Sequence, residues 1–392
     1  MVAFAQKRGI IAAVAATILT TLLMLTLVGP SVPYPRINIG GKTSDEHKKK
    51  PSWGTAVHNP KPASSHSSST QPSSATQPNP SEEKLAIVTF LSGTLDKEDN
   101  WEDDEYFSAT RLLAWQLLHS PATKIRRQNL DFYVIVTPSV SKSRRERLEK
   151  DGAKLWPVEF LYAEWLRGTD HEMRWDDLMG KLRVWEMVEY SRVLLLDGDI
   201  ILREPLDGIF DDPGTKFQVT NRSSAVKFPL PKGEELPELP DQYMLGGTHE
   251  TIGPVHEFPP TFENNGLQKY GYFNAGFFLL APNLQLFDYY CRLMNTKDGF
   301  DPRYMEQNLL NRIHAWDGAL PWKLIDVKWN MVAVNDADLD GGVKSMHQKW
   351  FVEPTSHSQR VRDISMKARW EMQGWYDAMD QARELEEKSR AS

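Results

Sequence analysis

The sequence is poor in two features that often decide a fold or a partner. It has a single cysteine, Cys291, among 392 residues, which excludes an intrachain disulfide. It has no excess of positive charge, because 46 Lys and Arg are outnumbered by 53 Asp and Glu, for a formal net charge of -7. A negatively charged chain repels a phosphate backbone, so we do not expect a general nucleic-acid binder. The chain instead has 40% hydrophobic residues and 13 tryptophans, enough for a sizeable core and for some aromatic faces that stack on sugar rings.

Long uncharged segments are scarce, and one lies near the N-terminus. Residues 10–28 contain no charged side chain, and two basic residues precede them, Lys7 and Arg8. A segment of this length can span a bilayer, and basic residues before it place the N-terminus on the cytosolic side. We therefore expect a cytosolic tail over residues 1–9 and an uncleaved signal-anchor helix over residues 10–29. A cleaved signal peptide is the alternative, although the residues that follow form a poor small-residue cleavage site.

The next segment, residues 30–83, has little that could pack in a core. It is rich in Pro, Ser, Thr, Lys and His, and residues 62–81 are almost wholly polar or proline. This composition predicts a disordered stem between the anchor and the folded part. Serines and threonines beside prolines are candidate sites for O-linked sugar, and an unmodified linker is equally compatible with the composition.

Strand and helix patterns alternate after residue 84. Residues 85–91, 131–137 and 272–280 are predicted strands. The predicted helices are residues 106–119, 141–152, 176–190, 284–295 and a helix that begins at Met305. Alternation of this kind predicts an α/β protein with a parallel sheet and helices on both faces.

The remaining segments have weaker patterns. Residues 217–220 and a segment between Trp322 and Lys328 are expected to form short strands. Residues 228–266 are rich in Pro and Gly and lack periodicity, which predicts a long functional or disordered loop. Residues 356–390 are charged and amphipathic, which predicts one helix or a helix pair that packs as a lid or a brace.

The stretch from Arg192 to Leu202 is central to the interpretation. An apolar run leads directly into Asp197, Gly198 and Asp199, and a second apolar run follows. A short continuous apolar run predicts a buried strand, and ligands of open α/β sheets bind at the carboxyl ends of strands. Two carboxylates there suit Mg²⁺ or Mn²⁺. Asp-Gly between hydrophobic runs is also a strong hairpin signal, so this stretch alone leaves a plain turn as an alternative.

Lys181 has an unusual position in the helix predicted over residues 176–190. Its spacing from Leu178 and Trp185 places it on the apolar side, where an unpaired ammonium group is costly. The side chain can extend to the surface or pair with a carboxylate such as Asp177. The third solution is an anionic ligand, a phosphate, near the carboxyl end of the following strand.

The order and spacing of several motifs resemble those of glycosyltransferase family 8, to which glycogenin and galactinol synthase belong. The resemblance covers roughly residues 85–352 and no single motif carries it. The motifs are Lys181-Leu-Arg-Val-Trp185, Asp197-Gly-Asp199, Phe273-Asn274-Ala-Gly276, Gln307-Asn-Leu-Leu-Asn311, Trp329-Asn330 and His347. Within this series the Asp-Gly-Asp sequence is much less compatible with a plain hairpin turn.

The resemblance implies a GT-A fold, which is a Rossmann-like, mixed and mostly parallel sheet with helices on both faces. We expect this domain over residues 84–352 and a C-terminal helical extension over residues 353–392. The family binds a UDP-sugar, retains the anomeric configuration and uses a divalent cation, usually Mn²⁺. Asp197 and Asp199 match the family's metal-binding acids, and His347 matches its third protein ligand; an imidazole among carboxylates suits Mn²⁺ better than Ca²⁺. Without the resemblance, His347 would be interpreted as an ordinary surface histidine.

Further residues match family positions that contact the donor. Thr89 matches the point where the first strand meets the uracil and ribose, and Tyr106 matches a tyrosine that stacks on uracil. Lys181 matches a lysine that meets the sugar nucleotide. Asn274 and Gln307 match residues that face the donor sugar and the reaction centre.

Two departures from the family pattern affect these assignments. Glu306 stands where many members have Asp before the Gln, and it is a candidate catalytic carboxylate or simply an exposed helix acid. The late family motif has a glycine and a proline that are missing around His347, so the assignment of Lys349 to the diphosphate is weakly supported.

The combined expectation is a type II Golgi membrane enzyme with its catalytic domain in the lumen. It would transfer a hexose from a UDP-sugar to a glycan, glycoprotein or glycolipid hydroxyl, with acceptor choice set by residues 221–270. Asn221-Arg222-Ser223 is a glycosylation sequon that is usable only in a lumenal region. One alternative is a UDP-GlcNAc-dependent enzyme; another is a non-catalytic protein that binds nucleotide sugars or carbohydrate. The sequence predicts no oligomeric state.

Overall fold

The structure, a computed structural model, describes residues 83–93, 104–166, 177–224, 228–267, 269–351 and 358–391. These ranges fall in one compact unit. The expected cytosolic tail, signal anchor and nearly all of the stem lie outside the described residues. Within the described ranges, no helix has both the length and the apolar character that a membrane span requires.

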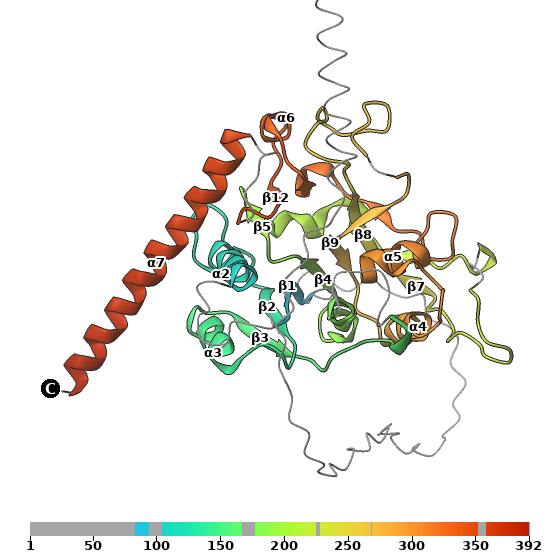
Figure 1. Cartoon of the computed structure of the whole chain (residues 1–392), viewed down its shortest axis with the longest axis horizontal. Coiled ribbons are helices and arrows are strands. Elements are labelled where there is room, and N and C mark those ends of the chain that lie inside the picture. Colours follow the sequence, from blue (N-terminus) through green and yellow to red (C-terminus); the bar gives the residue numbers. More distant parts are fainter. Residues whose placement is uncertain are drawn as a thin grey trace, which may run out of the picture. The chain divides into compact units, whose positions relative to one another are not determined.

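A seven-stranded sheet forms the centre of the fold, in the order β10-β8-β9-β4-β1-β2-β3 (Figure 1). The pairs β1–β2, β2–β3, β1–β4 and β8–β10 are parallel, and β9 runs antiparallel to both of its neighbours. The strands are β1 (Leu85–Leu91), β2 (Leu130–Val136), β3 (Lys154–Pro157), β4 (Arg192–Leu196), β8 (Leu245–His249), β9 (Phe273–Leu280) and β10 (Lys323–Leu324). The mostly parallel sheet is therefore confirmed.

Helices cover both faces of this sheet. They are α2 (Glu105–Leu118), α3 (Lys142–Lys150), α4 (Leu284–Met294), α5 (Met305–Ile313) and the 3-10 helix η4 (Leu178–Glu186). Every residue of β1 is buried, and its alternate side chains enter different cores. Ile87 packs in the core that includes residues of α2 and α3, whereas Val88 packs in the core that includes residues of η4, α4 and α5. The near-continuous apolar runs of the central strands follow from this two-sided burial.

The Asp-Gly-Asp stretch connects two sheets. After β4 ends at Leu196, the chain forms β5 (Ile200–Leu202), which belongs to a three-stranded sheet with β12 (Ser345–His347) and β11 (Met331–Val332). Strand β4 pairs with β1 and β9, and β5 pairs with β12, so β4 and β5 do not form a hairpin. The two acids thus lie at the carboxyl end of a central strand, at the junction between the sheets.

The expectation of a long loop over residues 228–266 is wrong in its central part. This segment contains β7 (Gln242–Tyr243), which pairs with β6 (Gln218–Val219), and β8, which is an inner strand of the main sheet. Two glycines, Gly246 and Gly247, interrupt the apolar pattern by which β8 would have been predicted. A Cβ atom on Gly246 would lie 2.9 Å from the carbonyl oxygen of Gly214, so the strand needs the glycine for close backbone approach.

The helix predicted over residues 176–190 is shorter than expected and has the 3-10 form. Its ends show the tighter hydrogen-bonding pattern, with Gly180 N donating to Asp177 O and Met187 N donating to Val184 O. A Cβ atom on Gly180 would lie 2.8 Å from the ring of Phe90, which shows how closely this segment packs on β1.

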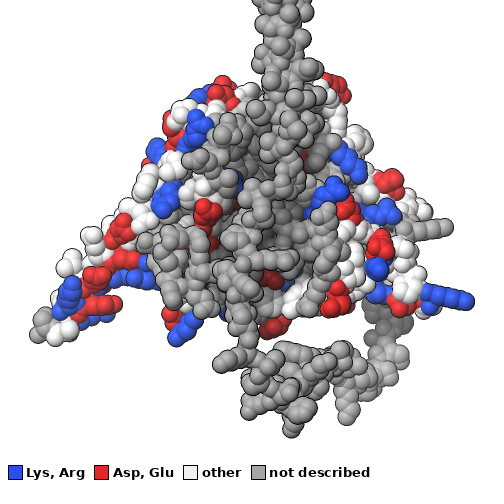
Figure 2. Space-filling model, in the orientation of Figure 1, with Lys and Arg blue, Asp and Glu red and all other residues white. Residues whose placement is uncertain are grey.

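The C-terminal segment is one helix, α7 (Gln359–Ala391), which packs beside α2 and α3 (Figure 1). Trp375 stacks on His119 with ring centroids 5.4 Å apart, and Asp380 pairs with Arg147 and Lys150. On the face shown in Figure 2, acidic and basic side chains alternate along this helix. These contacts correspond to the brace that we expected as one of two roles.

Short elements complete the described chain. They are η2 (Glu164–Leu166), η5 (Asp207–Asp211), η6 (Pro213–Thr215), η7 (Arg222–Ser224), η8 (Pro302–Tyr304), η9 (Val327–Trp329) and α6 (Asp336–Asp340).

Candidate active site

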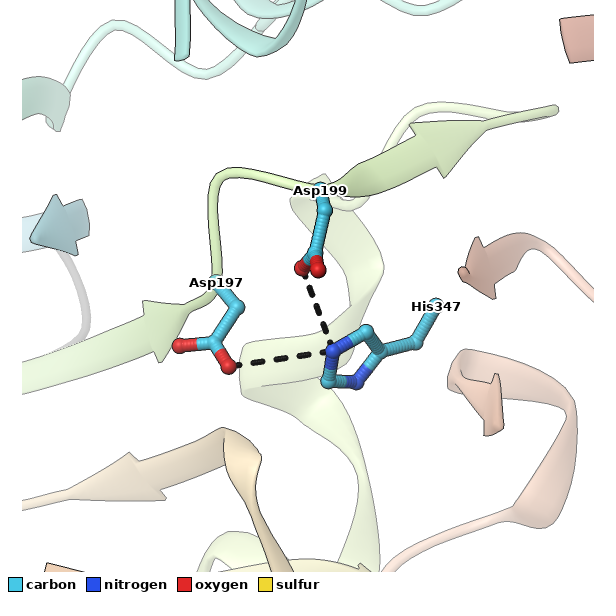
Figure 3. Close-up of side chains that lie close together, drawn as sticks. All are labelled: Asp197, Asp199 and His347. Carbon is cyan, nitrogen blue, oxygen red and sulfur yellow. Dashed lines mark ion pairs between the residues drawn. The ribbon is translucent and has the colours of Figure 1, made fainter. Parts of the chain in front are cut away.

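The two acids and the distant histidine point toward one another (Figure 3). His347 Nε2 lies 3.2 Å from Asp199 Oδ1 and 3.7 Å from Asp197 Oδ2. The topology explains this meeting: Asp197 follows β4, Asp199 precedes β5, and β5 pairs antiparallel with β12 so that His347 lies opposite Ile200. Residues 150 positions apart in sequence therefore share one corner.

The corner fits a divalent cation in its donors and its spacing. One ligand atom from each of Asp197, Asp199 and His347 lies within 4.8 Å of the others. One buried atom of the group, His347 Nδ1, has no hydrogen-bond partner among the described residues. Two carboxylates and an imidazole suit Mn²⁺ and similar ions. A Cβ atom on Gly276 would lie 2.3 Å from His347 Cε1, so glycine is required there to leave the corner open.

Neighbouring opposite charges set the direction of the pKa shifts of Asp199 and His347. Burial by itself raises the pKa of Asp199, but His347, Lys349 and Lys181 together hold it below its ordinary value. Burial by itself lowers the pKa of His347, but the nearby carboxylates, Asp199 first, raise it. The three side chains are therefore held together by ion pairs that a cation can replace.

Lys181 is buried and pairs with two carboxylates. Its Nζ atom lies 2.7 Å from Asp197 Oδ1 and 2.9 Å from Glu306 Oε1, and the residue is only 5% exposed. Burial disfavours the ammonium, but these two carboxylates raise the pKa of Lys181, so it stays charged. Extension to the surface is thus wrong, and the pairing partner is not Asp177, which instead accepts a hydrogen bond from Ser92.

Glu306 is not the exposed helix acid that the sequence allowed. It is 3% exposed, and burial raises its pKa even though Lys181 acts in the opposite direction. Its second carboxylate oxygen, Oε2, has no hydrogen-bond partner among the described residues. An oxygen of this kind can accept a hydrogen bond from a ligand hydroxyl.

Asn274 and Gln307 meet at a residue that the sequence analysis missed, Glu250. The Glu250 Oε2 atom accepts hydrogen bonds from Asn274 Nδ2 at 2.7 Å and from Gln307 Nε2 at 3.2 Å. Glu250 directly follows β8, at the same sheet edge as Asp197. An acid at the carboxyl end of a strand was the signal that identified Asp197, and Glu250 was missed because β8 was interpreted as a loop.

Most predicted site residues line one cavity of about 200 Å³. Its lining comprises Leu178, Lys181, Asp197, Asp199, Asn274, Gly276, Tyr304, Glu306, Gln307, His347 and Lys349. Leu178 and Tyr304 had not been identified as site residues; both are apolar or aromatic, and neither has a sequence signal. Two predicted residues are absent from this lining, Thr89 and Tyr106.

Thr89 and Tyr106 lie in β1 and α2. Thr89 is fully buried, and its Oγ1 atom has no hydrogen-bond partner in the described part of the chain. Tyr106 is close to the cavity edge, because its ring centroid is 5.9 Å from Lys349 Nζ and 5.2 Å from the ring of Phe351. Their contacts with the base and ribose of the donor stay predictions.

Comparisons with known proteins give a consistent result. A model of glycosyl transferase family 8 matches residues 103–348. An uncharacterized protein of Schizosaccharomyces pombe is 29% identical over 301 residues, which cover 70% of this chain and 76% of that protein. Galactinol synthase 2 of Arabidopsis thaliana is 29% identical over 235 residues, which cover 58% of this chain and 60% of that protein.

Solved structures are also similar, at low sequence identity. A crystal structure of the galactosyltransferase LgtC with donor and acceptor sugar analogues covers 72% of this chain and 95% of its own, with 16% identity and a TM-score of 0.40. Mouse xyloside xylosyltransferase 1 covers 68% of this chain and 97% of its own, with 13% identity and a TM-score of 0.38.

The family model is the decisive comparison. It spans more than half of the chain and includes both the Asp-Gly-Asp stretch and His347, which the structure brings together. The protein is a glycosyltransferase, and the chain belongs to glycosyltransferase family 8.

Proposed function

We propose that this protein is a metal-dependent, retaining glycosyltransferase that transfers a hexose from a UDP-sugar to a hydroxyl group of a glycan. The observation that carries the proposal is the convergence of Asp197, Asp199 and His347 in a cavity that also contains Lys181 and the Glu250-bound amides. Such a cavity offers a cation site, a buried positive charge and fixed polar groups in one place. These are the components needed to bind and activate a nucleotide diphosphate sugar.

Three side chains would hold the cation, namely Asp197, Asp199 and His347. A bound divalent ion, with Mn²⁺ as the best match to this donor set, would neutralise negative charge on the diphosphate leaving group. Lys181 is buried and paired with Asp197 and Glu306, so its ammonium group would offset part of the negative charge of these acids beside a bound diphosphate. In this arrangement Lys349, which also lines the cavity, supplies a second positive charge.

The hydrogen bonds around Gln307 limit what this side chain can do. Both Nε2 hydrogens are used, one toward Glu250 and one toward Tyr272, and Oε1 accepts a hydrogen bond from Ala275 N. The remaining lone pair of Oε1 is therefore the only unused polar function of the amide. It is suited to face positive charge that develops at the sugar carbon when the bond to the diphosphate breaks. Retention follows if the acceptor hydroxyl then attacks from the face that the diphosphate has left.

Asn274 and Glu306 are suited to hold the donor sugar. Asn274 uses Oδ1 to accept from Gly276 N at 2.9 Å and one Nδ2 hydrogen for Glu250, which leaves one N–H for a sugar hydroxyl. Glu306 offers the unpartnered Oε2 as an acceptor. A donor and an acceptor at fixed positions can recognise one hydroxyl pattern on a hexose.

The proposed setting is the Golgi lumen, with a single anchor helix over residues 10–29 and a stem over residues 30–83. The uncharged N-terminal segment and its preceding basic residues support this setting. Asn221, the sequon residue, is exposed, as glycosylation requires. Glycoproteins and glycolipids are the acceptors that such a compartment supplies, and residues 221–270 outside β8 are proposed to select among them.

The test is a panel of UDP-sugars incubated with the full chain and an acceptor mixture, with Mn²⁺ or with EDTA, and with free UDP as the readout. We expect one UDP-hexose to give Mn²⁺-dependent release of UDP that EDTA abolishes. Release of UDP that is equal with EDTA would contradict the metal dependence. Binding of UDP without release from any sugar would favour the non-catalytic alternative.

A further inference from the structure

A second cavity, of about 610 Å³, is larger than the candidate active site and shares no lining residue with it. It lies between the turn that precedes β9 and the outer side of α5. The turn contributes Lys269, Tyr270 and Tyr272, and the helix contributes Asn308 and Arg312. Nothing in the proposed transfer reaction uses these side chains directly.

A hydrogen bond between two side chains links the linings of the two cavities. The Tyr272 hydroxyl accepts a hydrogen bond from Gln307 Nε2 at 3.1 Å and donates one to Asn308 Oδ1 at 2.5 Å. Gln307 lines the candidate active site, whereas Tyr272 and Asn308 line the second cavity. Consecutive residues of α5 thus line the two cavities, and a ligand in the second cavity would lie against Tyr272, which hydrogen-bonds to Gln307.

The second cavity combines aromatic faces with polar groups. Tyr270 is 71% exposed, and its ring lies perpendicular to that of Trp316 with centroids 4.8 Å apart. The backbone at Gly271 supports this wall. Gly271 has a φ of 67°, and a Cβ atom there would lie 3.4 Å from the ring of Trp316. The Gly271 carbonyl accepts a hydrogen bond from Trp322 Nε1 at 2.9 Å. The aromatic wall is therefore built by several contacts and does not depend on one side chain.

Around this wall the cavity presents groups of both polarities. Lys269 and Arg312 are donors, and Asp301 and Asp317 are acceptors, while Asn308 has one N–H left after donating to Asp301 O. A pyranose ring has an apolar C–H face and a rim of hydroxyl groups that donate and accept hydrogen bonds. Flat aromatic faces beside mixed donors and acceptors match both parts of such a ring. A purely anionic or purely apolar ligand would leave half of this lining unmatched.

We propose that the second cavity is a saccharide-binding subsite that holds a sugar unit of the acceptor glycan remote from the reacting hydroxyl. This inference rests on the proposed function, because it assumes that the acceptor is a glycan. Its consequence is selectivity for length: oligosaccharide acceptors that reach both cavities bind more tightly than the single sugar that reaches one.

The test uses the full chain and two readouts, with gluco-, manno-, galacto- and chito-oligosaccharides of one to six units as probes. Direct binding is followed by tryptophan fluorescence without donor, and transfer is followed with the UDP-sugar that the donor panel identifies. We expect Tyr270→Ala to weaken binding of the preferred oligosaccharide about tenfold and to raise its KM about tenfold. The variant should leave the KM of the monosaccharide acceptor unchanged. It should also leave the rate of UDP release without acceptor unchanged. Tyr162→Ala, at another exposed tyrosine outside this cavity, is the matched control.

Asp317→Ala provides a second variant, because Asp317 is exposed and its loss removes one acceptor without disturbing the aromatic wall. The proposal is overturned if no oligosaccharide of the panel binds, or if both variants bind and transfer like the unmodified chain. It is also overturned if both variants lower transfer to short and long acceptors equally. Failure of the proposed function would look different. Neither the unmodified chain nor any variant would then release UDP from any UDP-sugar, whereas the binding measurement without donor would still show whether the second cavity binds an oligosaccharide.

Discussion

Two buried aspartates, Asp151 and Asp199, illustrate two uses of charge in one molecule. Both are almost inaccessible, with exposed fractions of 2% and 7%. Asp151 has both carboxylate oxygens engaged, one with Arg111 at 2.6 Å and the other with Arg147 at 2.8 Å. Asp199 Oδ1 is ion-paired with His347 Nε2 at 3.2 Å, but the same cluster leaves His347 Nδ1 without a hydrogen-bond partner among the described residues. Because buried polar groups are normally paired, the incomplete cluster indicates a ligand site and the complete one indicates a structural connection.

The surroundings of the two aspartates support the same distinction. Arg147 also pairs with Asp380 of α7, so the network around Asp151 joins α2, α3 and the C-terminal helix. Asp199 instead borders an open cavity, which Gly276 keeps free of side-chain atoms. A buried charge cluster is therefore informative about function only when its unpaired atoms and its adjacent space are considered together.

The largest effect is expected from Asp199→Ala. Loss of a metal-binding carboxylate should reduce Mn²⁺-dependent UDP release by about 10³-fold, as for loss of a group that stabilises transition-state charge. Without metal, the free energy of unfolding should fall at pH values where His347 is protonated, because the imidazolium loses the carboxylate that pairs with it, and should change less at higher pH. Enzyme assays and urea denaturation measure the two quantities, and Asp211→Ala, at a mostly exposed side chain, is the control. Unchanged turnover would show that Asp199 does not bind a catalytic metal, which would contradict the functional half of the comparison.

The opposite profile is expected from Asp151→Ala. This change removes the carboxylate that Arg111 and Arg147 share. Arg147 keeps its ion pair with Asp380, and removal of one partner of a buried ion pair costs about 3–5 kcal/mol of stability. Urea denaturation should show this loss, whereas kcat per folded molecule should stay within a factor of about two. A large loss of kcat in protein that remains folded would show that the Asp151 network also serves catalysis.

The pH dependence should have opposite signs with and without metal. In the metal-free protein the raised pKa of His347 contributes stability that is complete below the ordinary histidine value of about 6.5 and is lost as the pH rises through the raised value. A cation requires neutral imidazole, so Mn²⁺ affinity should instead rise with pH by up to about tenfold per unit below the raised pKa. Calorimetric titration in buffers of different ionisation enthalpy measures the proton release. Mn²⁺ binding that is independent of pH between 5 and 8 would remove His347 from the ligand set.

A smaller effect is expected from Glu250→Gln. The change keeps the size of the side chain but removes the negative charge that accepts from both Asn274 and Gln307. We expect kcat to fall about tenfold with little change in the KM of the donor, since one charged hydrogen bond is worth about 1.5–3 kcal/mol. Steady-state kinetics beside Glu257→Gln, an exposed neighbour, provide the measurement. Equal kinetics for the two variants would show that the amides keep their orientation without Glu250.

The sequence predicted the parts of the fold that have a regular apolar pattern. The strands β1, β2, β4 and β9 are mostly apolar because both of their faces are covered, and the structure confirms them. Strand β8 was missed because Gly246 and Gly247 interrupt its apolar pattern; at Gly246 the backbone of Gly214 lies close, and at Gly247 the ring of Phe273 does. The 3-10 form of η4 was missed because the apolar spacing of a short segment does not distinguish it from an α-helix.

The site shows the same limits. Asp197 and Asp199 were predicted from their place after a strand, and Lys181 from its costly position on an apolar side. His347 has no local signal, since its role depends on the pairing of β12 with β5, and only the order of family motifs indicated it. Glu250 could not be identified while its strand was unrecognised. The pairing of Lys181 with Glu306 could not be predicted either, because it depends on how η4 and α5 pack together in the folded protein.

Gly276 has a consequence for other chains of this kind. One methyl group at this position would overlap the imidazole of His347 and the Oδ2 atom of Asp197, at 2.3 Å and 2.7 Å. Alanine there would preserve the apolar run of β9 and the overall architecture while obstructing cation capture. A relative with any larger residue at the equivalent position would be expected to keep the fold but lose metal-dependent activity. A single codon change can therefore separate active from inactive family members.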